Sequence, residues 1–269
     1  MLHKHKFKKF FGQNFLTNPV FANEIINLSK IDKETHVLEI GPGLGYLTKF
    51  LLEHSAKVTA VEIDFSLIPK LLKKFSIHPN FELINEDILK INLDEIFKDS
   101  KKICIVGSLP FNISKKIIRK TIDFGMYTNS ELKPFTFIVQ DEVANLYTNL
   151  DNKLGVIYQH YCNVKKANVI PASAFTPKPK VNGAILCFEI NKKQKNTNFE
   201  TLVKQAFTQP RKTLYNNLKK AYQLDNLERS FKKLNLNKNT RAAELNIDTW
   251  EKLAEELSNS YSYTFTNNS

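Results

Sequence analysis

The segment Val37–Gly45 constrains the fold of this chain more than any other. An apolar run at 37–40 ends in glycines at every second position, 41, 43 and 45. This pattern predicts a buried strand and a tight turn into a helix, with a backbone that a ligand can approach closely. A dinucleotide fingerprint would need a glycine at position 46, where the chain has Tyr46. The loop therefore favours a smaller nucleoside ligand, or it is a purely structural turn.

Acidic residues end the next two predicted strands. Glu62 follows the glycine loop by about twenty residues, the offset at which a carboxylate can accept hydrogen bonds from both ribose hydroxyls. Asp87 ends the third strand and can accept from an exocyclic amine of adenine, with Ile88 flanking the ring. Together with the glycines, this set fits S-adenosylmethionine. The alternative is that such acids only cap helices, the role that we predict for Asp64 before a helix over 66–75.

Apolar runs alternate with helical patterns from about residue 31 to 190, which predicts a mostly parallel sheet with helices on both faces. The last two runs lack an intervening helical period and predict an antiparallel pair at the edge. The predicted strands are 36–40, 58–63, 81–85, 103–107, 135–140, a run near 156–164, and 183–190. A first helix is expected over 18–30, entered through Asn18-Pro19.

The composition changes after Ile190. A polar stretch predicts a linker, apolar residues then recur at helical spacing, and the end of the chain is polar and aromatic without a period. We therefore predict an α/β domain with a small all-helical domain behind it, the first helix of which is capped near Asn198. The predicted boundaries are 1–190, a linker at 191–198, a helical domain at 199–260 and a disordered tail at 261–269.

The formal net charge of +12 points to a polyanionic partner. Residues 204–241 hold ten Lys or Arg residues and two acids, and clustered cations neutralise phosphates. The alternative is that lysines merely line solvated surfaces. No apolar run is long enough for a membrane helix and the N-terminus lacks a secretory pattern, so we expect a cytoplasmic protein. Cys104, Cys162 and Cys187 lack metal-site or redox spacing and are predicted to be buried thiols, and no metal site is expected.

The turn after the fourth predicted strand carries the candidate chemistry. Its residues, Ser108-Leu109-Pro110-Phe111, suit a planar amine, because the Ser108 hydroxyl and a main-chain carbonyl of Leu109 or Pro110 can accept its N–H groups. Phe111 can stack on an extruded base. A sulfonium donor leaves as a neutral group, so the reaction depends on positioning and electrostatic support. The alternative is a structural strand-to-helix turn with Phe111 in the core.

Because these features occur together and in this order, the chain resembles the ribosomal RNA adenine dimethyltransferases. The resemblance covers almost the whole chain, through motifs at 11–16, 39–45, 61–64, 86–89, 108–111, 140–144, 173–181, 211–213 and 241–244. It implies a Rossmann-like class I methyltransferase sheet that acts with S-adenosylmethionine. The implied reaction is N6,N6-dimethylation of two adjacent adenines near the 3′ end of small-subunit rRNA, with the rRNA or ribosomal particle as partner and a monomer as the default state.

The resemblance also implies roles for individual residues. The cofactor-binding set is Gln13, Asn14, Leu16, Gly41, Gly43, Glu62, Ile63, Asp87, Ile88 and Ser108. Phe111, Phe175, Arg211 and Lys212 are implied on the substrate side, and the segment 175–181 resembles a wall of the target-base pocket.

Two positions depart from the family pattern, which has Asn and Tyr where this chain has Ser108 and Phe111. Phe111 keeps a stacking face, whereas a serine hydroxyl is a shorter and weaker acceptor than an amide. We expect retained activity. Two alternatives stay open: a large-subunit rRNA methyltransferase that confers antibiotic resistance, and a catalytically weakened RNA-binding assembly factor.

Overall fold

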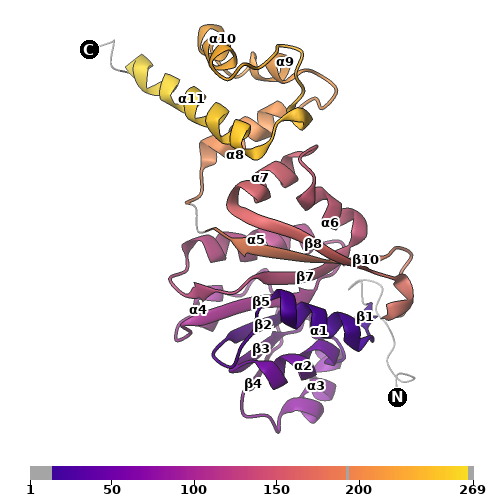
Figure 1. The fold of residues 1–269 in the computed structure, drawn as a ribbon. Helices are drawn as coiled ribbons and strands as arrows, with labels where there is room; N and C mark the ends of the chain where they lie inside the picture. Colours follow the sequence, from indigo (N-terminus) through magenta and orange to yellow (C-terminus); the bar gives the residue numbers. More distant parts are fainter. Residues whose placement is uncertain (1–13, 192–193, 266–269) are drawn as a thin grey trace. The chain divides into compact units, whose positions relative to one another are not determined.

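The computed structural model describes residues 14–191 and 194–265, with side chains up to residue 258. The chain divides into two compact units (Figure 1). Unit 1 comprises Met1–Ala144 and Val164–Lys192, and unit 2 comprises Asn145–Asn163 and Lys193–Ser269. This division differs from the predicted boundary at 190, because the segment 145–163 groups with the C-terminal helices.

A mixed β-sheet forms the centre of unit 1. Its described strands are β2 (His36–Ile40), β3 (Lys57–Val61), β4 (Phe81–Ile84), β5 (Lys102–Ser108), β6 (Glu131–Leu132), β7 (Phe135–Gln140), β8 (Cys162–Ile170) and β10 (Gly183–Ile190). The strand order is β4-β3-β2-β5-β7-β10-β8, with β6 paired to β5. Neighbours from β4 to β7 run parallel, and β10 runs antiparallel to β7. The predicted α/β sheet with an antiparallel edge is confirmed.

Helices cover both faces of this sheet. They are α1 (Pro19–Leu28), α2 (Tyr46–His54), α3 (Ile68–Phe75), α4 (Leu93–Phe97), α5 (Ser114–Tyr127) and the start of α6 (Asp141–Thr148). Apolar residues of α1, α2 and α3 share one cluster with Val37, Val106 and Ile138. On the opposite face, Gly125 of α5 lies against Phe135, and α4 contacts the ring of His36 through Phe97. The central strand β2 is covered on both faces, and all five of its residues are buried.

Two predicted helix starts are confirmed. The Asn18 side chain accepts a hydrogen bond from the Val20 N–H at 3.0 Å, and Pro19 occupies the first turn of α1. Asp64 accepts from the Ser66 N–H at 3.0 Å. It thereby caps the short 3-10 helix η2 (Phe65–Leu67), which leads directly into α3.

The strand predicted near 156–164 is wrong. This run forms α7 (Lys153–Tyr161), and β8 begins only at Cys162. The Asn152 side chain starts the helix by accepting from the N–H groups of Leu154 and Gly155. A short apolar run has the same appearance in a buried strand and a buried helix, so its pattern could not separate the two.

Unit 2 is helical in its described part, apart from the first residues of β8. Besides α7, its elements are α8 (Thr197–Ala206), α9 (Leu214–Leu218), α10 (Leu224–Lys233), the 3-10 helix η4 (Ala242–Glu244) and α11 (Ile247–Phe265). Its core contains Phe199, Leu218, Phe231 and Trp250, all nearly inaccessible to solvent. The ring of His160 on α7 stacks on Phe199 with centroids 3.9 Å apart. This contact shows why the segment 145–163 belongs with these helices.

Two expectations about the ends of unit 2 helices need correction. The N-cap of α8 is Asn196, the side chain of which accepts from the Phe199 N–H at 3.0 Å, so the predicted cap at Asn198 was two residues late. The predicted disordered tail starts inside α11, which continues to Phe265. Residues 266–269 lie outside the described residues.

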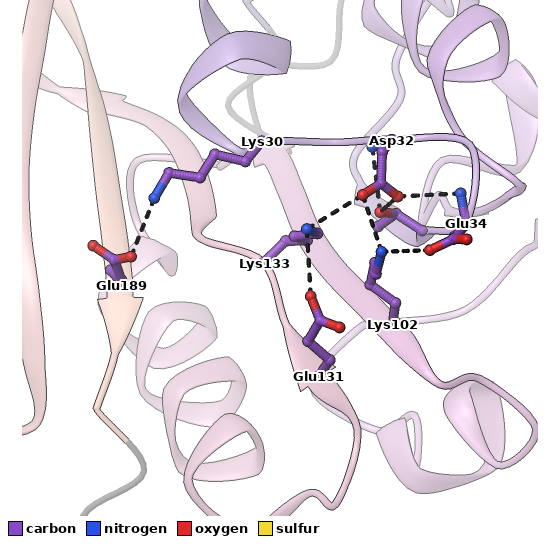
Figure 2. A network of polar contacts seen from close by, with 8 residues as sticks. Lys30, Asp32, Glu34, Lys102, Glu131, Lys133 and Glu189 are labelled. Carbon is purple, nitrogen blue, oxygen red and sulfur yellow. Dashed lines mark hydrogen bonds and ion pairs between the residues drawn. The ribbon is translucent and has the colours of Figure 1, made fainter.

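A network of ion pairs lies where β2, β5 and β7 begin (Figure 2). Lys102 contacts Asp32 at 3.1 Å and Glu34 at 2.6 Å, and Lys133 contacts Asp32 at 3.2 Å. The Thr35 hydroxyl donates to Asp32 at 2.7 Å. That hydrogen bond and the two lysines lower the pKa of Asp32 well below its usual range. The network ties the amino-terminal edge of the parallel strands together, at the opposite end from their carboxyl termini.

The three cysteines are buried and unpaired, as predicted. Burial raises the pKa of the Cys104 and Cys162 thiols, which makes them poor nucleophiles. None of the helices in the described ranges is long and apolar enough to cross a membrane.

Candidate active site

A pocket opens at the carboxyl ends of the parallel strands, with an empty volume of about 1070 Å³ that includes its open mouth. This edge is where ligands bind in open α/β sheets. Most of its lining comes from the loops after β2, β3, β4 and β5. The residues around it include Asn14, Leu16, Glu39, Gly41, Gly43, Glu62, Ile63, Asp87, Ile88, Ser108, Leu109, Pro110, Phe111, Ile113, Ile117 and Phe175.

A small two-stranded sheet brings two distant segments to the pocket. In it, β1 (Phe15–Leu16) pairs antiparallel with β9 (Phe175–Thr176), so that Leu16 lies opposite Phe175. The Thr17 N–H also donates to the Ala174 carbonyl at 3.1 Å. Residues 14–16 and Phe175, far apart in sequence, therefore line the same pocket.

The glycine loop and Glu62 form a single hydrogen-bonded unit. Gly41 and Gly43 have φ values of +69° and +59°, a conformation that residues with a β-carbon rarely adopt. The Glu62 carboxylate accepts from the Gly43 N–H at 3.1 Å and from the Asp64 N–H at 2.8 Å. Burial raises the pKa of Glu62, and these two donors act in the opposite direction. The loop thus holds a buried carboxyl group at the pocket wall.

The loop after β4 presents Asp87 and Ile88. Ile88 is buried, and Asp87 is partly accessible. One oxygen of Asp87 accepts from the Leu89 N–H at 2.9 Å, which fixes the carboxylate beside its own turn. The side chain of Ile63 is 44% exposed although it lines the same pocket. Two aliphatic side chains and one carboxylate therefore surround a space suited to an amino-substituted ring.

The turn at the end of β5 is held by main-chain hydrogen bonds. The Leu109 N–H donates to the Ile138 carbonyl at 3.0 Å, whereas the Pro110 carbonyl accepts from the N–H groups of Ile113 and Ser114 at 3.2 and 3.0 Å. Both lone pairs of the Pro110 oxygen are thus used by the start of α5. The sequence predicted the carbonyl of Leu109 or Pro110 as the acceptor for an amine. Because the Pro110 carbonyl is occupied, the Leu109 carbonyl is the better candidate.

Glu39 is a pocket residue that opens the 39–45 motif but to which the sequence analysis gave no role. It lies inside β2, is only 1% exposed, and its Oε2 atom has no hydrogen-bond partner among the described residues. Burial raises the pKa of Glu39 to about 8, and the nearby Glu62 adds to the effect. The available signal was an acid in the middle of an otherwise apolar strand, which is unusual unless the acid meets a partner.

The structure brings together every predicted site residue of unit 1 that it describes. Asn14, Leu16 and the residues selected after β2 to β5 all line the same pocket, and so does Phe175, which is 4% exposed. Gln13 lies outside the described residues. Arg211 and Lys212 are exposed on unit 2. In the described ranges, no group of three or more His, Cys, Asp or Glu side chains is arranged to hold a metal ion.

Solved structures of RNA methyltransferases share this fold. A dimethyladenosine transferase from Plasmodium falciparum superposes with a TM-score of 0.75 at 25% identity, covering 92% of this chain and 98% of that one. The 23S rRNA methyltransferase ErmE also gives a TM-score of 0.75, at 24% identity over 91% of this chain and 100% of that one, a likeness of fold alone. The sheet and the pocket at its carboxyl edge thus define a Rossmann-like methyltransferase.

Comparison of the sequence with known families shows which kind of methyltransferase this is. Residues 4–259 match the family model described as ribosomal RNA adenine dimethylase, and the chain belongs to that family. A protein named ribosomal RNA small subunit methyltransferase A from Clostridium acetobutylicum is 32% identical over 266 residues, 95% of each chain. A protein of the same name from Francisella tularensis subsp. novicida is 37% identical over 268 residues, 96% of this chain and all of that one.

Proposed function

We propose that this protein transfers methyl groups from S-adenosylmethionine to the N6 atoms of two adjacent adenines near the 3′ end of small-subunit rRNA, during ribosome biogenesis. One observation carries the proposal. In a chain of the adenine dimethylase family, one pocket collects Glu62, Asp87 and the turn at 108–111 from three parallel strands of one sheet.

The residues present fit the cofactor. Glu62 would accept from the ribose hydroxyls, Asp87 from the adenine amine, and Ile63 and Ile88 would pack on the ring faces. The unpartnered Oε2 atom of Glu39 is a second indication, because a buried carboxyl group is stabilised by a cationic partner such as the ammonium of the methionine end.

Other residues would complete the cofactor site. Gly41 and Gly43 would bring the main chain close to the cofactor, and Gln13, Asn14 and Leu16 would close over the methionine end. The bound cofactor supplies a methyl group on a sulfonium, and the thioether that leaves is neutral.

The turn at 108–111 would orient the target amine. The adenine N6 lone pair is delocalised into the ring, and hydrogen bonds to its two N–H groups favour the pyramidal nitrogen that can attack a methyl carbon. The Ser108 hydroxyl and the Leu109 carbonyl are the acceptors proposed here, because the Pro110 carbonyl is already engaged. Phe111 would stack on the extruded base, with Phe175 in the wall behind it. Catalysis then rests on orientation and charge stabilisation.

Unit 2 would bind the RNA backbone. Most cations between residues 204 and 241 are exposed, among them Arg211, Lys212, Lys219 and Lys220. Cations of this kind bind phosphates and release counterions, largely without regard to sequence. The segment 199–260 remains our proposal for the RNA-binding part, and 1–190 for the cofactor-binding part. We further propose a monomer that acts in the cytoplasm, where its substrate particle would assemble.

The test is incubation with methyl-labelled S-adenosylmethionine and ribosomal subunits that lack the modification. Labelled N6,N6-dimethyladenine in small-subunit rRNA is the expected result. Label confined to large-subunit RNA would instead support the antibiotic-resistance activity, and RNA binding without label would support an assembly factor. The relatives from Clostridium and Francisella carry the small-subunit name, which favours the first outcome.

A further inference from the structure

Lys120 makes two hydrogen bonds that reach from α5 to the loop after β4. Its ammonium group donates to the Leu89 carbonyl at 3.0 Å and to the Ile91 carbonyl. Both acceptors are main-chain atoms. Lys120 does not line the pocket, and neither the sequence motifs nor the site described above give it a role.

The loop that Lys120 contacts is otherwise shaped mostly by its own hydrogen bonds. The Lys90 N–H donates to the Asp87 carbonyl at 2.8 Å, and the Leu89 N–H donates to the Asp87 side chain. Such bonds shape the turn but do not fix it against the rest of unit 1. At the start of the loop the Asn85 side chain donates to the Glu62 carbonyl at 2.7 Å, and beyond Asp87 the charged Lys120 donor, bound to two carbonyls, adds an attachment to α5. Charge-assisted bonds are stronger than neutral ones.

The other end of the attachment is the helix beside the catalytic turn. α5 begins shortly after 108–111, and Ile113 and Ile117, at its start and in its first turn, line the pocket. Lys120 lies about one turn beyond Ile117 on the same helix. Its contacts therefore join the loop that carries Asp87 and Ile88 to the element that follows the substrate-binding turn.

We propose that Lys120 is a positioning residue, which holds the Asp87 loop at the distance needed to recognise the 6-amino group of the cofactor's adenine. The proposal rests on the proposed function, because it takes Asp87 as the adenine acceptor. Glu62 is held instead by the glycine loop and by the Asp64 N–H, at the end of β3. Loss of Lys120 should therefore weaken adenine recognition and leave the ribose contacts in place.

The test uses two ligands that differ at one position of the base. S-adenosylhomocysteine carries the 6-amino group, and S-inosylhomocysteine carries a 6-oxo group that cannot donate to a carboxylate. Dissociation constants for both are measured by calorimetry with the full-length protein. The variants are Lys120→Met, which keeps the aliphatic stem, and Lys120→Arg, which keeps the charge. The control is Lys116→Met, exposed on the same helix.

In the wild type we expect tighter binding of the adenosyl ligand. Lys120→Met should weaken it about tenfold, the size expected when one charged hydrogen bond is lost. The inosyl affinity should change less than about twofold, a scale well below that of one lost bond. Lys120→Arg should keep part of the preference for the adenosyl over the inosyl ligand. Lys116→Met should keep all of it.

Hydrogen exchange gives a second measurement that needs no ligand. Lys120→Met should increase amide exchange in peptides that cover 85–92 while peptides from β2 remain protected. If Lys120→Met leaves the ratio of the two dissociation constants unchanged, or weakens the binding of both ligands equally, the role of Lys120 is overturned and the proposed function stays intact. A wild type that binds neither ligand would instead overturn the proposed function, and this inference with it.

Discussion

Replacing Glu39 by Gln should alter how the stability of unit 1 depends on pH. The carboxyl group is 1% exposed and lacks a partner at Oε2 within the described residues, and burial raises its pKa from 4.5 to about 8. In the unfolded chain the same group ionises near its ordinary pKa of 4.5. Between these two values the folded state keeps a proton that the unfolded state has lost, so stability must fall as the pH rises.

The size of the effect follows from linkage. Well inside this window each pH unit costs about 1.4 kcal/mol, so the wild type should lose roughly 2 to 3 kcal/mol between pH 5.5 and 7.5 because of Glu39. Gln has nearly the same shape and does not titrate. The two proteins should therefore be similar in stability at about pH 5 and diverge steadily up to about pH 8, the value at which Glu39 itself ionises.

The assay is urea unfolding of both proteins at several pH values, combined with hydrogen exchange of peptides from β2 and β3. Exchange is needed because a chain of two units need not unfold in one step. The single tryptophan, Trp250, lies in unit 2, and its fluorescence serves as an internal control. Titrating groups far from Glu39 contribute equally to both proteins, so the difference between them reports the titration of Glu39 together with its coupling to Glu62.

Parallel pH curves for the wild type and Glu39→Gln would refute the reasoning. They would mean that Glu39 ionises in the folded protein near its ordinary pKa, through water or a cation that compensates its burial. A divergence in the opposite direction, in which the wild type gains stability over the variant as the pH rises, would have the same consequence.

Four further predictions follow from the site and the charges. Glu62→Ala should weaken S-adenosylmethionine binding in a calorimetric titration, because the ribose hydroxyls lose their acceptor; unchanged affinity would exclude that role. Ser108→Asn should preserve or raise turnover in the methyl-transfer assay, because an amide carbonyl reaches further and accepts more strongly; a severe loss would mean that the pocket is built around serine. RNA affinity should fall steeply with added salt, by a slope of roughly 0.7–0.9 per phosphate contacted, and a flat response would remove unit 2 as the phosphate-binding surface. Asp32→Asn should lower the free energy of unfolding at neutral pH by up to about 1 kcal/mol and leave cofactor affinity unchanged. Because the pKa of Asp32 is lowered, the wild type should lose this advantage as the pH falls below its ordinary value of 3.8, and a stability difference that is independent of pH would argue against the ion pairs.

Much of the fold and the site could be predicted because the signals are local. β2, β5 and β7 agree with their predicted ranges within one residue at either end. Glu62 and Asp87 could be selected because residues that follow parallel strands meet at one edge of the sheet. The sheet order β4-β3-β2 agrees with this reasoning, since it places their strands beside that of the glycine loop.

Other features could not be read from local patterns. The segment 153–161 is helical because its apolar residues pack in unit 2, a fact that its own periodicity does not carry. The pairing of Leu16 with Phe175 joins positions that lie far apart in the sequence. The burial of Glu39 was indicated only by its position in an apolar strand, and the contact of Lys120 with two carbonyls of a distant loop has no sequence signature.

The sequence alone determined the elements and the chemistry that they can carry: a strand ending in glycines, acids after the next two strands, an acceptor-rich turn and a basic helical region. Backbone preferences and side-chain chemistry act over a few residues, so they can be recognised one motif at a time. The tertiary structure decided which of these motifs share a pocket, which carboxyl group is deprived of water, and which lysine holds a loop in place. Those outcomes depend on packing between distant segments, because desolvation and non-local hydrogen bonds exist only once the chain has folded.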